Sequence, residues 1–70
     1  MELDPVEQLT LAIVRQHGEG LLPADLRTLV CQQHDVKRRD VRSAIARLWA
    51  RGYINLGHDC RIRPVDLGGV

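Results

Sequence analysis

Basic side chains gather between residues 37 and 47, and they are the strongest chemical feature of the sequence. The group consists of Lys37, Arg38, Arg39, Arg42 and Arg47, with Ser43 among them. Arg38 and Arg42 are four residues apart, as are Arg39, Ser43 and Arg47, which is the spacing of one side of a helix. Guanidinium groups bind phosphates and the O6 and N7 atoms of guanine through paired hydrogen bonds. The pattern therefore predicts a helix face that binds a polyanion.

The charge of the whole chain is divided along its length. The net charge is only +1, but residues 1–35 hold two arginines against six carboxylates, a net charge of −4. Residues 36–63 hold eight Lys and Arg residues against two aspartates, a net charge of +6. A basic second half joined to an acidic first half indicates a polyanion-binding surface on one side of the molecule.

Other candidate chemistry is weaker. Two cysteines and two histidines could form a tetrahedral zinc site, namely Cys31, His34, His58 and Cys60, but their Cys-x-x-His and His-x-Cys spacings are unusual for zinc. We expect no metal, no cofactor and reduced cysteines. There is no glycine-rich phosphate loop and no Ser–His–Asp arrangement, so we expect no enzyme. Asp40 is expected to pair within its own helix with Lys37 or Arg47.

Composition limits the architecture to one small domain, which we place at residues 1–64, with a flexible tail at 65–70. The 70 residues are 44% hydrophobic and 27% charged, as in a globular domain. No apolar run is long enough to cross a membrane, and the first residues do not resemble a secretory signal. The expected location is the cytoplasm, and association with a nucleoid of bacterial or phage type fits the same data. Trp49 and Tyr53 are the only aromatic residues, which argues against a stacking surface for single strands.

Three helices are expected to position these side chains. The first begins at Pro5 after the N-cap Asp4 and ends before Gly18, the second covers about 24–34, and the third covers about 38–51, with Gly52 at its C′ position. The expected buried positions are Val6, Leu9, Ile13 and Gln16 in the first, Leu26, Leu29, Val30 and Gln33 in the second, and Val41, Ala44, Ile45 and Leu48 in the third. A tight turn around Val36 joins the second and third helices.

After Gly52 the hydrophobic period changes from 3.6 to 2, which predicts a hairpin over residues 53–63. The side chains expected to face inward are Ile54, Leu56, Cys60 and Ile62, while Tyr53, Asn55, Arg61 and Arg63 face outward. Leu21 and Leu22 are too few for an independent strand but can add to one. Arg61 and Arg63 either bind a ligand or protect an edge strand from aggregation.

This order of elements resembles the winged helix-turn-helix family, and the residues that carry the resemblance are 22–29 and 36–54. The fold class expected is mainly α (α+β), a three-helix winged helix with a short β-hairpin wing. The resemblance implies that the third helix enters the major groove of DNA and that the wing contacts the phosphate backbone. The implied DNA-binding residues are Lys37, Arg38, Arg39, Arg42, Ser43, Arg47, Arg61 and Arg63. Lys37 departs from the family, in which Ser or Thr often caps this helix.

The sequence thus favours a small protein that binds double-stranded DNA and regulates transcription. The main alternative is a protein-interaction module that docks an acidic partner through the basic face or Trp49, and an RNA-binding role is a third. Trp49 is expected either in the core or as an exposed interface anchor. Leu11 lies off the predicted buried stripe of the first helix, so a homodimer through that helix is possible.

Overall fold

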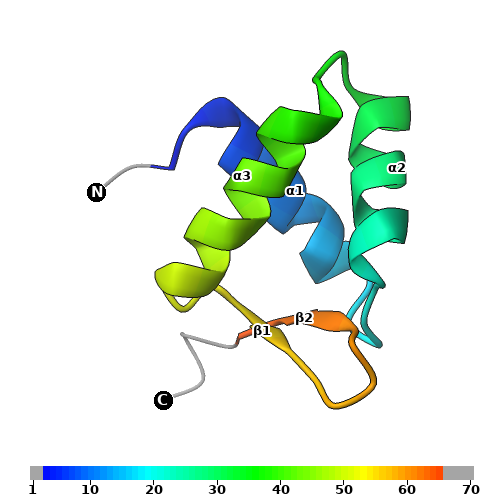
Figure 1. Cartoon of the computed structure of the whole chain (residues 1–70), viewed down its shortest axis with the longest axis vertical. Helices are drawn as coiled ribbons and strands as arrows, with labels where there is room; N and C mark the ends of the chain where they lie inside the picture. Colours follow the sequence, from blue (N-terminus) through cyan, green and yellow to red (C-terminus); the bar gives the residue numbers. More distant parts are fainter. Residues whose placement is uncertain (1–2, 66–70) are drawn as a thin grey trace.

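Three helices and a β-hairpin make up residues 3–65, the part of the chain that the computed structural model describes (Figure 1). The helices are α1 (Pro5–Gln16), α2 (Pro23–Gln33) and α3 (Arg38–Ala50). The strands β1 (Ile54–Leu56) and β2 (Ile62–Pro64) form the hairpin, which lies at one end of the helical layer. This confirms the expected three-helix winged helix with a short wing. The predicted tail at 65–70 lies outside the described residues, except for Val65.

The helix boundaries follow local signals in the sequence. Asp4 caps α1 by accepting a hydrogen bond of 2.8 Å from the backbone N–H of Glu7, and Pro5 and Pro23 occupy first positions where no N–H is needed. Lys37 precedes α3, and its side chain makes no capping hydrogen bond. The helix nevertheless begins at Arg38, as expected. Gly52 ends α3 with φ of +83°, a left-handed conformation that favours glycine.

The hairpin extends into a small three-stranded arrangement. In the antiparallel pair, Leu56 lies opposite Ile62. The backbone of Leu21 also bonds to Ile62 in both directions, with N–H···O distances of 3.0 and 2.6 Å. Leu21 therefore adds to the sheet as expected, and the segment between α1 and α2 is joined to the wing.

The loop of the hairpin is longer than the sequence pattern predicted. The N–H of Gly57 donates to the carbonyl of Arg61, and Cys60 lies in the turn with φ of +63°. Cys60 and Leu56 are both exposed, so neither joins the core as predicted, although Leu56 shares a face with Ile62. For Cys60 the reason is that the turn interrupts the two-residue alternation. Leu56 lies opposite Ile62 at the loop end of the hairpin, where it lines an open hollow instead of the core.

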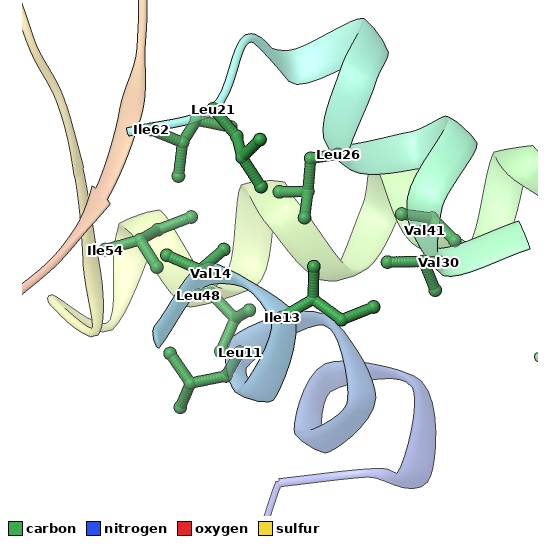
Figure 2. Close-up of a cluster of buried hydrophobic side chains, with 10 residues drawn as sticks. All are labelled: Leu11, Ile13, Val14, Leu21, Leu26, Val30, Val41, Leu48, Ile54 and Ile62. Atoms are coloured by element: carbon green, nitrogen blue, oxygen red, sulfur yellow. The ribbon is translucent and has the colours of Figure 1, made fainter. Parts of the chain in front are cut away.

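A single hydrophobic core holds the three helices and the hairpin together, as Figure 2 shows. Its buried side chains come from every element and are Leu11, Ile13, Val14, Leu21, Leu26, Val30, Val41, Leu48, Ile54 and Ile62. Helix α3 crosses α1 and packs beside α2, while Ile54 and Ile62 close the end of the core nearest the wing. Burial of this apolar surface is the main force that fixes α3 in place.

The buried face of α1 differs from the predicted stripe. Leu11 is 4% exposed, whereas Gln16 is exposed and Val6 and Leu9 are half-buried. Helix α1 contacts α2, α3 and β2, so it buries a wider arc than a helix with a single neighbour. The side chain of Leu11 is thus buried in the core and is not accessible as a contact for a homodimer.

Three residues of the other helices also differ from the prediction. On α2, Leu26 and Val30 are buried as predicted, but Leu29 is half-buried and Gln33 is exposed. On α3, Ile45 is half-buried beside the fully buried Leu48.

Among residues 3–65, no helix has the length and hydrophobicity that crossing a membrane requires.

Candidate nucleic-acid interface

The outward side of the first half of α3 carries an open group of cations, which we call the basic face. It consists of four cations, Lys37, Arg38, Arg39 and Arg42, together with Ser43, and all five residues are exposed. Val41, Ala44 and Leu48 are buried on the opposite side of the helix, and this fixes the direction of the basic face. Within residues 3–65, no carboxylate lies within 4.0 Å of these four cations. Their charge is therefore available to a ligand.

Helix α2 adds to the basic face a fifth cation, Arg27, that the sequence interpretation missed. Arg27 lines an open depression of about 340 Å³ together with Arg38, Arg39, Arg42 and Ser43. Arg27 follows the buried Leu26 and stands on the side of α2 that faces α3. In the sequence, the one sign of this role is that Arg27 follows a predicted buried residue in the helix before the tight turn. Its proximity to Arg38 and Arg42 results from the packing of α2 against α3, which the sequence pattern does not describe.

Arg47 belongs to a different part of the surface. Its Nη1 atom lies 2.9 Å from Asp4 Oδ2 and 3.6 Å from Glu7 Oε1. Counting by four along α3 groups Arg47 with Ser43, but each such step rotates the side chain by about 40° toward α1. The structure thus separates Arg47 from the basic face. The expected pairing of Asp40 with Lys37 or Arg47 is absent from residues 3–65.

Glu7 joins the start of α1 to the end of α3. Its side chain is only 3% exposed, and its Oε2 accepts a hydrogen bond of 2.8 Å from Arg51 Nη1. Asp4 belongs to the same network because it accepts a hydrogen bond of 2.9 Å from Arg47. The backbone N–H of Glu7 and, in addition, Arg47 lower the pKa of the Asp4 carboxyl. This network pairs Arg47 and Arg51 and leaves the positive charge of α3 concentrated in its first half.

The wing arginines are held by the wing itself. Arg63 donates to both carboxylate oxygens of Asp59, at 3.1 and 2.7 Å, in a two-bond ion pair. Arg61 donates to the carbonyl oxygen of Gly20 at 3.3 Å, and its Nε atom lies 3.8 Å from Asp59. Neither of the two interpretations given above, ligand binding and protection of an edge strand, is tested by this geometry; it adds a third role, since both arginines are bonded within the wing or to the segment that it joins.

The Asp59–Arg63 pair leads to a prediction about pH. Hydrogen bonds from Arg63 and from the backbone of Arg61 lower the pKa of Asp59 from 3.8 to about 2. Because the folded-state value is depressed, the pair stabilises the hairpin fully above pH 3.8, and this contribution disappears as the pH falls through about 2. In an NMR titration of the Asp59 carboxyl carbon, we expect a midpoint near pH 2.

The variant Arg63→Ala supplies the comparison for this titration. It removes the largest cause of the shift but leaves the backbone N–H of Arg61 as a donor at 3.1 Å. The midpoint of Asp59 is expected to rise toward 3.8 without reaching it. An Asp59 midpoint that is the same in both proteins would show that the pair does not persist in solution.

Trp49 lies outside the core, with 54% of its surface exposed. It lines an apolar hollow of about 90 Å³, which is formed by Pro23, Ile45, Trp49, Ile54, Asn55, Leu56 and Ile62. The core interpretation of Trp49 was therefore wrong, and the alternative of an exposed anchor remains. Asn55 is the only polar residue of this hollow.

The cysteines and histidines do not come together in the described part of the chain. Across residues 3–65, no three side chains from His, Cys, Asp and Glu are grouped in a way that could hold a metal ion. Cys31 is half-buried in α2, whereas Cys60 is exposed in the wing turn. Both cysteines are free thiols.

Comparison of the chain with protein-family models, with curated proteins and with solved structures finds no match in any of the three. The functional argument therefore depends on the geometry and charge of the molecule itself.

Proposed function

We propose that the chain binds double-stranded DNA through the basic face and regulates transcription by occupying its site. The observation that carries the proposal is the open cluster of Arg27, Lys37, Arg38, Arg39 and Arg42 on α2 and α3. An α-helix fits the major groove, and a helix-turn-helix unit presents the first half of its second helix to the bases. The protein would act in the cytoplasm as a binding protein without catalysis.

The residues of the basic face divide by position. Arg39 and Ser43 lie most directly opposite the buried side of α3, and Arg42 lies between them and α2. We assign these three residues to base edges and to the phosphates nearest the groove. Lys37 stands just before the helix and Arg27 on the neighbouring helix, where they would contact the phosphates on either side of the groove. Arg38 lies between these two groups. Arg47, Arg61 and Arg63 are not part of this proposed contact surface, since protein groups already engage them.

The salt dependence of binding tests the proposal. Each phosphate contact releases counterions, so roughly five contacts predict a slope of about −4 to −5 for log affinity against log salt concentration. The measurement is fluorescence anisotropy of a labelled random duplex with the wild-type chain at several salt concentrations. Binding that is absent or independent of salt contradicts the proposal.

Single variants show which cations contribute. Arg42→Ala and Arg27→Ala are each expected to reduce the steepness of the slope by about one. Arg15→Ala is the matched control, because Arg15 is an exposed arginine of α1 outside the basic face and its removal changes the net charge equally. An equal effect of Arg15→Ala would indicate attraction by net charge alone.

A further inference from the structure

The apolar hollow beside Trp49 is a second surface feature that the proposed DNA contact does not use. Trp49 and Leu56 flank it with exposed fractions of 54% and 38%. Exposed tryptophan is uncommon on surfaces without partners, and tryptophan is enriched among the residues that dominate protein interfaces. The hollow therefore requires an explanation of its own.

The hollow adjoins the basic depression along the junction of α2 and α3. On α3, Arg38, Arg42, Ile45 and Trp49 follow at intervals of four, three and four, and so lie along one side of the helix. On α2, Pro23 lines the hollow and Arg27, one turn further, lines the depression. An apolar site and a cationic site thus lie next to each other between the same two helices.

The size of the hollow selects the kind of group that can fill it. Its volume of about 90 Å³ lies between the roughly 10–15 Å³ that one water occupies and the roughly 150 Å³ of a cavity that binds benzene. One branched aliphatic side chain matches this volume. The apolar group that duplex DNA presents in its major groove is the thymine methyl, a single carbon that leaves most of the hollow empty.

The arginines beside the hollow indicate which charged group the ligand carries next to that aliphatic side chain. Arg27, Arg38 and Arg42 have no carboxylate partner among residues 3–65. Arg42 and Trp49 are seven residues apart, about 10 Å along the helix, which about three residues of extended peptide span. The matching ligand carries a carboxylate about three residues from an aliphatic side chain.

From this arrangement we infer that the junction of α2 and α3 is a docking site for an acidic protein segment. The segment inserts a leucine-like side chain beside Trp49 and Leu56, and its carboxylates pair with Arg27, Arg38 and Arg42. The inference does not depend on DNA binding, because it concerns a different ligand. It does imply that such a segment and duplex DNA compete for Arg38 and Arg42.

A titration with synthetic peptides tests the inference. The probe is a short acidic peptide with one leucine three residues from a pair of aspartates. One matched peptide replaces the leucine by serine, and another replaces the acids by their amides. Trp49 is the single tryptophan of the chain, so its fluorescence reports directly on the hollow. We expect a saturable change with the probe and at least about tenfold weaker binding of each matched peptide.

Variants distinguish binding at the hollow from nonspecific hydrophobic binding elsewhere on the surface. Leu56→Ser is expected to weaken binding of the probe about tenfold. Leu22→Ser is the matched control, since Leu22 is also 38% exposed but does not line the hollow, and it should leave the affinity unchanged. Circular dichroism confirms that both variants are folded. No saturable change with the wild-type chain, or equal losses in the two variants, overturns the inference.

Duplex DNA supplies the remaining comparison. If Trp49→Ala weakens binding of the duplex as strongly as Arg42→Ala does, the hollow is part of the DNA surface and the inference is wrong. Because Trp49→Ala has no tryptophan, its binding of the probe peptide is followed by the anisotropy of a fluorescent label on the peptide. If Trp49→Ala changes the affinity for DNA less than about twofold while abolishing that for the labelled peptide, the inference is supported. A wild-type chain that binds the peptide but no DNA contradicts the proposed function alone.

Discussion

Replacing Arg39 and Arg42 together by alanine is expected to lower the affinity for duplex DNA at least about a hundredfold. Both side chains leave α3 opposite the buried Val41, Ala44 and Leu48, and no carboxylate within residues 3–65 pairs with them. A well-placed arginine contact to a base is worth about 1–3 kcal/mol, and each 1.4 kcal/mol is a factor of ten. The measurement is a duplex titration at fixed salt concentration.

The control for this experiment is the double variant Arg15→Ala/Arg47→Ala. It removes the same net charge, but Arg15 lies on α1 and Arg47 is paired with Asp4 at 2.9 Å. We expect a loss of less than about fivefold, as is reasonable for long-range attraction in salt. A loss as large as that of the Arg39/Arg42 variant would contradict the assignment of the basic face.

Leu48→Ala is expected to destabilise the fold by about 3 kcal/mol, within the usual range for a buried leucine. Leu48 is fully buried where α3 meets α1, and its removal leaves a cavity in the only core of the described chain. Domains of this size have about 4–10 kcal/mol of stability in total. The variant should therefore unfold at a much lower urea concentration, measured by circular dichroism.

Leu22→Ala is the comparison for this measurement. It removes the same atoms from a leucine that is 38% exposed, so the free energy of unfolding should fall by only about 1 kcal/mol, well below the loss from Leu48→Ala. Equal losses from Leu48→Ala and Leu22→Ala would mean that α3 is not fixed by the core described here. In that case the direction of the basic face would also be unsupported.

Local signals in the sequence predicted the elements better than they predicted the site. Asp4 with Pro5, Pro23 and Gly52 mark helix ends through backbone constraints that act over a few residues, and the helices begin and end near those positions. The hairpin was found from its alternation, but Cys60 was misplaced because the type of turn decides where the alternation resumes.

The composition of the site depends on contacts between residues far apart in the chain. Arg47 was assigned to the basic face because its spacing fits, yet it pairs with Asp4, 43 residues earlier. Arg27 was missed because only the packing of α2 against α3 brings it to Arg38. Neither outcome can be read from helical periodicity, which describes each helix alone.

The double backbone link between Leu21 and Ile62 has a mechanical consequence. It joins the loop end of the hairpin, where Ile62 pairs with Leu56, to the connection between α1 and α2. The hairpin therefore cannot swing without breaking two hydrogen bonds and disturbing two buried side chains. We therefore expect the surface to adapt to a ligand through rotamers of its arginines more than through movement of the hairpin. A duplex that follows its surface would have to supply the curvature itself, and easily bent sequences would then be favoured even at base pairs that no side chain touches.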